Sequence, residues 1–169
     1  LKDFRMYEIE ILTKKGFKNP RGEHAFSEIL GLGVKGVKKV EYSQVYRIDG
    51  GISFAEADKI ASELLSDKIT ETYKTSVVKP LDCGCGGVDF KSRNSYSSLS
   101  LIEVWYKKGV TDTVAESVVK AVKDLGIKTD IKAAAGHKYY VYGKLSGNIL
   151  HSIATKLLAN TLIQEYKIK

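Results

Sequence analysis

Cysteine is scarce in this 169-residue chain, which contains only Cys83 and Cys85. Two cysteines so close together cannot build the disulfide framework on which small secreted domains depend. Long apolar runs are missing as well: no stretch approaches the roughly 20 residues of a membrane helix, and residues 1–5 contain no signal-peptide core. We therefore expect a soluble protein of the cytoplasm.

Motifs for metal binding or nucleophilic catalysis are also missing. Tetrahedral zinc needs four ligands, usually in two pairs, and Cys83 and Cys85 have no second pair because the three histidines are scattered. The cysteines are interpreted as reduced surface thiols and the histidines as structural residues. The glycine-rich residues 31–36 follow an expected helix and precede an expected strand, which is the reverse of a phosphate-binding loop. We expect no catalytic residue, no metal and no cofactor in this chain.

Positive charge exceeds negative charge, with 27 Lys and Arg against 20 Asp and Glu and a formal charge of +7. The lysines are spread along the chain with acids between them, which is typical of a solvated surface. Residues 137–142 nevertheless combine lysine and tyrosines as RNA-recognition sheets do, and Tyr140 and Tyr142 would share one face. The matching positions of the other half hold Arg47 and Asp49, and the RNA-recognition signature is absent. An RNA-binding α+β module stays open as an alternative, although nucleic acid is not the partner that we expect.

The chain repeats itself, without a gap, at a spacing of 93 residues. Such a period predicts a tandem duplication. We assign one copy to residues 6–75 and the other to residues 101–169, with a flexible linker rich in glycine and serine at residues 76–100. The identical pairs include Lys15 and Lys108, Gly16 and Gly109, Glu23 and Glu116, Tyr46 and Tyr139, and Leu64 and Leu157.

Each copy predicts the same order of elements: strand, helix, long strand or hairpin, helix, strand. Asn19 is suited to cap the first helix of one copy and Asp112 or Thr113 that of the other, and Ser53 with Glu56 forms a capping box for a second helix. This order predicts a ferredoxin-like α+β unit with helices on one face of an antiparallel sheet. The two units are expected to pair edge to edge as a pseudo-two-fold internal dimer. The strands are predicted at residues 7–13, 37–48 and 69–75 in the first copy and at 101–106, 131–142 and 162–168 in the second.

Short motifs in both copies resemble those of the PurS family. Residues 107–112 and 157–166 carry the resemblance in the second copy. In the first copy, Asn-Pro-Arg-Gly at residues 19–22 looks like the family's Asp-Pro-x-Gly helix start, and Leu-Leu-Ser-Asp at residues 64–67 like its Leu-Leu-Ala-Asn/Asp ending. PurS is the small subunit of phosphoribosylformylglycinamidine (FGAM) synthase in purine biosynthesis. The tandem form resembles the PurS-like N-terminal region of fused large synthase chains.

The resemblance implies a non-catalytic part of a glutamine-hydrolysing ligase. It would bridge the ATP-dependent synthetase (PurL) and the glutaminase (PurQ) so that ammonia passes between them, with ATP and Mg bound by the synthetase. A further homo-oligomer and a tandem metabolite-sensing regulatory domain both stay open. The residues expected at the partner interface are Lys15, Gly16, Asn19, Asp67, Lys108, Gly109, Asp112, Lys138, Tyr140 and Asn160.

Overall fold

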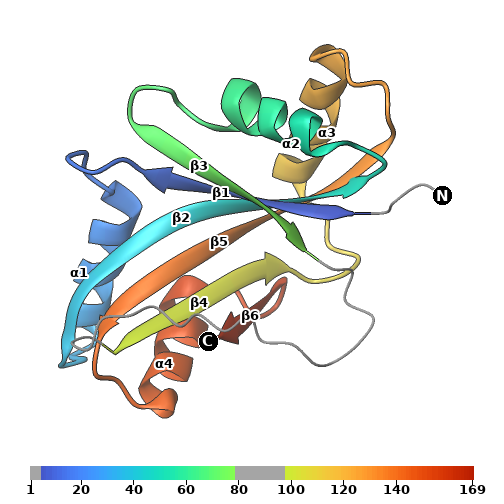
Figure 1. Ribbon diagram of the computed structural model, residues 1–169. Coiled ribbons are helices and arrows are strands. Elements are labelled where there is room, and N and C mark those ends of the chain that lie inside the picture. The colour runs from blue at the N-terminus through green and yellow to red at the C-terminus, as the bar shows by residue number, and fades with distance from the viewer. Residues whose placement is uncertain (1–4, 79–97) are drawn as a thin grey trace.

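The structure is a computed structural model that describes residues 5–78 and 98–169 (Figure 1). Cys83 and Cys85 lie outside the described residues, as does most of the expected linker. No helix in the described part of the chain is long and apolar enough to cross a membrane. The first copy contains β1 (Met6–Thr13), α1 (Pro20–Gly31), β2 (Val37–Gly50), α2 (Phe54–Ile60), η1 (Ala61–Leu65) and β3 (Glu71–Val78). The second contains β4 (Leu99–Tyr106), α3 (Thr113–Asp124), β5 (Ile131–Gly143), α4 (Gly147–Ile153), η2 (Ala154–Leu158) and β6 (Gln164–Ile168).

The two copies share one six-stranded sheet in the order β3-β1-β2-β5-β4-β6. All neighbouring strands are antiparallel, and β2 pairs with β5 along almost its whole length, from Val37 opposite Gly143 to Gly50 opposite Ile131. The expected edge-to-edge pairing of two α+β units is therefore confirmed. We call the β2–β5 pair the seam.

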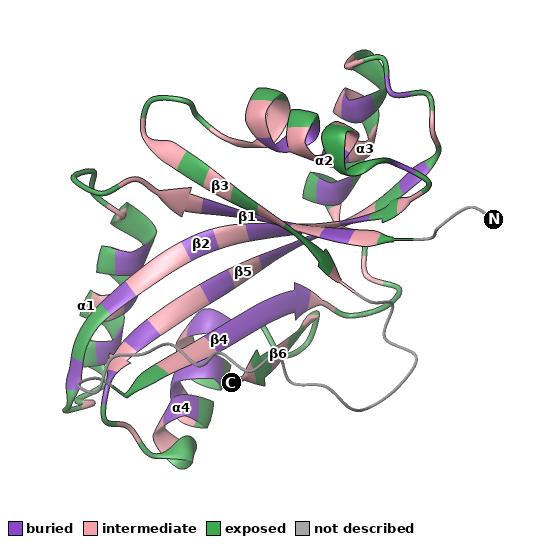
Figure 2. Ribbon diagram, in the orientation of Figure 1, coloured by how far each residue is buried: buried purple, intermediate pink, exposed green. Residues whose placement is uncertain are grey.

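The helices cover one face of the sheet, and the strands alternate accordingly. On β1, Tyr7, Ile9 and Ile11 are buried beneath helices, whereas Glu8 and Glu10 point to the opposite, helix-free face. Figure 2 shows buried and less buried residues alternating along the long central strands. This period of two is what a sheet covered by helices on one side requires.

Each hydrophobic cluster is built from both copies. One lies under α2 and α3, where Ile60 of the first copy packs in the same cluster as Val122 of the second. The other lies under α1 and α4, where Ile29 and Ile153 share a cluster. The strands β2 and β5 must be long because each runs through both clusters: Ile48 belongs to the first cluster and Val40 to the second. The first helix of each copy thus completes the other copy's core.

Residues 93 apart occupy matching environments. Asn19 accepts from the backbone N–H of Gly22 and donates to the carbonyl of Tyr42 at 2.7 Å. Its counterpart Asp112 accepts from the N–H groups of Ala115 and Ala135 at 2.9 and 2.8 Å. Both residues therefore cap a first helix and tie its start to a central strand. The predicted caps and the duplication are confirmed.

The last strand of each copy starts later than predicted. Ile69 and Leu162, predicted as strand residues, lie in turns because the side chains of Asp67 and Asn160 accept from their backbone N–H groups. β3 runs to Val78 and β4 begins at Leu99, so residues 76–78 and 99–100 lie in strands.

Candidate functional site

Two projecting corners, which we call the tips, carry most of the residues predicted at the interface. The first tip is residues 14–18 together with residues 66–70, and the second is residues 107–111 together with residues 159–163. They lie at the ends of β1 and β4, which point in opposite directions because three antiparallel pairings separate them. Two equivalent surfaces therefore face away from each other across the sheet.

The same hydrogen bonds hold both tips. Lys14 Nζ donates to the carbonyl of Lys68 at 2.5 Å, and Lys107 Nζ donates to that of Thr161 at the same distance. Asp67 accepts from the N–H groups of Ile69 and Thr70 at 2.6 and 3.2 Å, and these bonds hold the pKa of its carboxyl below its usual range. Each pair of loops is thus fixed before any partner arrives.

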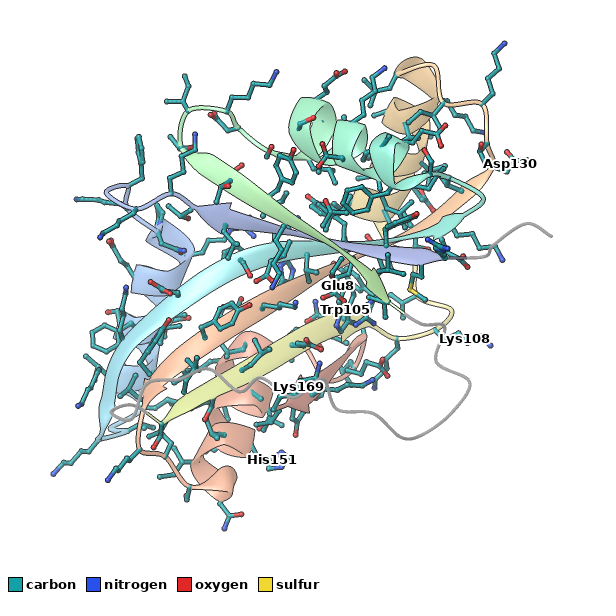
Figure 3. All side chains as sticks on the ribbon, in the orientation of Figure 1. Glu8, Trp105, Lys108, Asp130, His151 and Lys169 are labelled. Atoms are coloured by element: carbon teal, nitrogen blue, oxygen red, sulfur yellow. The ribbon has the colours of Figure 1, made fainter. Side chains whose placement is uncertain are left out.

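Each tip exposes a branched aliphatic side chain among lysines. Ile69 is 74% exposed and Leu162 is 85% exposed, the highest values among the large hydrophobic residues that the structure describes. Lys15 and Lys108 are exposed beside them, and Figure 3 shows Lys108 extending away from the body of the molecule. Single exposed aliphatic residues are common on proteins, but the same position in two diverged copies, held by the same turn, makes each tip a candidate binding surface.

The remaining predicted residues have other environments. Gly16 and Gly109 form the turns of the tips with φ angles of 95° and 88°, which favour glycine. Asn19 and Asp112 adjoin the tips, but their side chains are used in helix capping. The tips thus gather the predicted residues Lys15, Gly16 and Asp67 at one corner and Lys108, Gly109 and Asn160 at the other.

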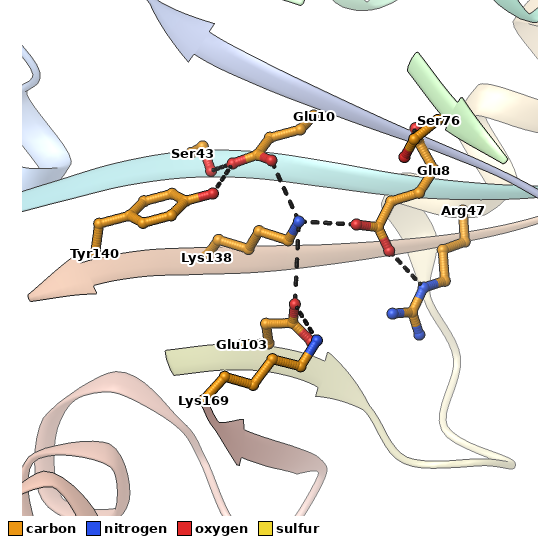
Figure 4. Close-up of polar contacts among 9 residues, drawn as sticks. All are labelled: Glu8, Glu10, Ser43, Arg47, Ser76, Glu103, Lys138, Tyr140 and Lys169. Carbon is orange, nitrogen blue, oxygen red and sulfur yellow. Dashed lines mark hydrogen bonds and ion pairs between the residues drawn. The ribbon is translucent and has the colours of Figure 1, made fainter. Parts of the chain in front are cut away.

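Lys138 and Tyr140 lie far from the tips, on the helix-free face of the sheet. Lys138 is only 7% exposed, and its Nζ donates to Glu8 at 2.8 Å and to Glu10 at 3.2 Å (Figure 4). Tyr140 donates its hydroxyl to Glu10 at 2.5 Å. Their polar atoms are occupied inside the chain, and the carboxylates beside Tyr140 give the RNA-binding alternative no support, since they repel phosphate.

A set of charged and polar residues, most of them buried or half-buried, surrounds Lys138, and we call it the seam cluster. Its third carboxylate, Glu103, is 2% exposed, lies 4.0 Å from Lys138 Nζ and accepts from Lys169 at 3.0 Å. Arg47 donates to Glu8 at 3.0 Å. The members of the seam cluster are Glu8, Glu10, Ser43 and Arg47 from the first copy, and Glu103, Lys138, Tyr140 and Lys169 from the second.

Opposite charges outweigh burial at two members of the seam cluster, Glu8 and Lys138. Burial alone would raise the pKa of Glu8, but its bonds to Lys138 and Arg47 outweigh burial and lower that pKa. Burial alone would lower the pKa of Lys138, but the carboxylates of Glu8, Glu10 and Glu103 outweigh it and raise that pKa. Glu8 and Lys138 therefore form an ion pair near neutral pH.

A polar chain crosses the seam on the helix face. Arg21 donates to the hydroxyl of Tyr42 at 2.7 Å, and that hydroxyl lies 2.8 Å from Nδ1 of His137. Burial, and then the positive charge of Arg21, lower the pKa of His137. Burial raises the pKa of Tyr46 to about 12. This chain ties α1 to both central strands.

An open hollow of ≈ 370 Å³ lies between α1 and η2, where the metabolite-sensing alternative would need its ligand. His24 and Glu28 on its wall pair with each other at 3.4 Å. Among the described residues, no side chain that lines this hollow has a buried polar atom without a hydrogen-bond partner. Within residues 5–78 and 98–169, no three His, Cys, Asp or Glu side chains are placed to hold a metal ion.

Sequence reasoning missed the seam cluster. Glu8 and Glu10 alternate with isoleucines, which is the usual pattern of a strand with one solvated face. The available signal was the comparison of the copies: Lys138 replaces Val45, and Glu8 replaces Leu101. A cation and an acid that appear at new positions in opposite copies indicate a contact between them.

Comparison with known proteins agrees with this duplicated architecture. The family model PurS, described as phosphoribosylformylglycinamidine (FGAM) synthase, matches residues 6–79 and again residues 100–169. No curated protein matches the chain. The two matched segments coincide with the two halves of the sheet, and their motif residues lie in the tips or in the elements next to them. The chain thus belongs to the PurS family, as a tandem of two PurS-like units, and has a role related to FGAM synthase in purine biosynthesis.

Proposed function

We propose that this chain is a non-catalytic bridging unit of FGAM synthase, acting in the cytoplasm. It docks the ATP-dependent synthetase (PurL) to the glutaminase (PurQ), so that ammonia released from glutamine reaches the synthetase without escaping into water. ATP and Mg²⁺ belong to the synthetase in this scheme, and this chain contributes no reacting group.

The observation that carries the proposal is the pair of equivalent tips that face in opposite directions. A scaffold that joins two larger proteins needs two separate surfaces at a fixed distance, and a shared antiparallel sheet supplies that rigidity. The tips are also pre-organised by their own hydrogen bonds, which lowers the entropy that docking must overcome.

The tips predict the chemistry of the partner surfaces. The first tip has four lysines and one carboxylate, and the second has two lysines and no carboxylate. A matching partner surface has an apolar pocket for Ile69 or Leu162 with acidic residues at its rim. Aliphatic anchors in such pockets contribute on the order of 2 kcal/mol, or about 30-fold in Kd.

Binding assays with charged substitutions in the tips test the proposal. Ile69→Asp and Leu162→Asp should each weaken binding to one partner by about 30-fold or more, and the double variant should form no ternary complex. Leu30→Asp is the matched control, because Leu30 is 47% exposed on α1 outside both tips and should bind normally. Unchanged binding of the double variant to both partners would show that the tips are not the docking surfaces.

A further inference from the structure

We propose that the seam cluster is a pairing code, by which the first PurS-like unit accepts the second as its partner and rejects another copy of itself. The two units are built alike, so backbone pairing alone would join any two of them. Side chains that meet between the copies must therefore distinguish the pairings, and the seam cluster is the charged set among them.

The two copies contribute opposite net charges to the seam cluster. The first copy supplies Glu8, Glu10 and Arg47, which sum to −1. The second supplies Glu103, Lys138 and Lys169, which sum to +1. The natural pairing is therefore neutral, and Figure 4 shows Lys138 at its centre between three carboxylates.

A pairing of two first copies would lack this balance. Val45 would lie at the position of Lys138, and Ser76 at that of Lys169. Four carboxylates would then share two arginines, leaving a net charge of −2 on largely buried groups. Buried charge without a partner is strongly unfavourable.

A pairing of two second copies would carry the opposite excess. Two copies of Glu103 would meet two of Lys138 and two of Lys169, a net charge of +2. Because the Lys169 side chain is 59% exposed, water would screen part of this excess. Of the two pairings between like copies, that of two first copies should therefore be the less stable.

A second contact across the seam also requires one first copy and one second copy. The guanidinium carbon of Arg47 lies 4.0 Å from the centre of the Trp105 ring, which joins the first copy to the second. The counterparts of these residues are Tyr140 and Leu12. A pairing of two first copies would lack the tryptophan, and a pairing of two second copies would lack the arginine, so this cation–π pair forms only between a first and a second copy.

A full-length chain in which residues 101–169 are replaced by a second set of residues 8–76 tests the proposal. Urea unfolding of this first–first tandem should show no cooperative transition, or a midpoint about 1–2 M below that of the natural chain. A first–first tandem as stable as the natural chain would overturn the proposal.

If the first–first tandem does not fold, a second variant still tests the proposal, because it restores the charges of the natural seam cluster. Glu8→Leu, Val45→Lys, Arg47→Tyr and Ser76→Lys, made only in the second set, recreate the natural charges. The control variant keeps Glu8→Leu and Arg47→Tyr but carries Val45→Met and Ser76→Met. Methionine keeps a side chain of similar length to lysine and removes the cation. The second variant should raise the midpoint by at least about 1 M urea over this control. No gain over the control would overturn the proposal.

Discussion

Replacing Lys138 by methionine should destabilise the chain more than any other single loss of charge in the seam cluster. Lys138 Nζ lies 2.8, 3.2 and 4.0 Å from the carboxylates of Glu8, Glu10 and Glu103. Glu8 and Glu103 would keep a second cation, but Glu10 would keep only hydroxyl donors. Breaking a buried ion pair from one side costs about 3–5 kcal/mol, a large part of the 5–15 kcal/mol that stabilises a typical domain.

Urea unfolding followed by circular dichroism measures this loss. With a slope of about 1–3 kcal/mol per molar, the midpoint should fall by roughly 1–5 M. Lys132→Met is the matched control, because Lys132 is exposed on the same strand, and it should change stability by less than about 0.5 kcal/mol. Equal stability of the two variants would refute the account of the seam cluster.

The pH dependence of stability tests the role of Lys138 in a second way. The pKa of Glu8 is lowered from 4.5, so its contribution is present above that pH and lost as the pH falls further. The pKa of Lys138 is raised from 10.5, so its contribution is present below that pH and lost as the pH rises. The difference between the natural chain and Lys138→Met should therefore be largest between about pH 4.5 and 10.5 and shrink on both sides.

Three further predictions follow from single contacts. Gly136→Ala would place a Cβ 2.6 Å from the Trp105 ring, so it should cost about 1–3 kcal/mol and shift the emission of this single tryptophan; unchanged emission and stability would contradict the contact. Asn19→Ala and Asp112→Ala should each cost about 1 kcal/mol in thermal unfolding, and a large difference between them would argue against equivalent caps. The pKa of His137 is lowered from 6.5, so stability should fall as the pH drops below that value, and His137→Gln should remove this part of the pH dependence; an identical profile would refute the assignment.

Local sequence signals predicted the repeating unit well. The Asn19 cap and the capping box of Ser53 and Glu56 follow from short-range chemistry, and the duplication led us to expect the edge-to-edge sheet. The turns that delay the last strands were harder to predict, because Ile69 and Leu162 suit a strand as well as an exposed turn. Only the hydrogen bonds from Asp67 and Asn160 decide between the two.

Side-chain contacts between the copies were the part that local sequence patterns did not show. Alternation of acids with isoleucines in β1 indicates a solvated face, and nothing local shows that Lys138, 128 residues from Glu10, closes over it. The sharing of each core by both copies is equally non-local, since α1 carries the same apolar stripe whichever copy it covers. Both the contacts of Lys138 and the shared cores depend on how the two copies pair in the folded chain.

The rate of FGAM formation by the synthetase and glutaminase, measured with and without this chain, tests the proposed bridging most directly. With glutamine as the nitrogen source, adding the chain should raise the rate, and the variant with both Ile69→Asp and Leu162→Asp should not. With ammonium chloride as the source, the rate should be independent of the chain, because no transfer from the glutaminase is needed. A glutamine-dependent rate that is the same with and without the chain would contradict the account.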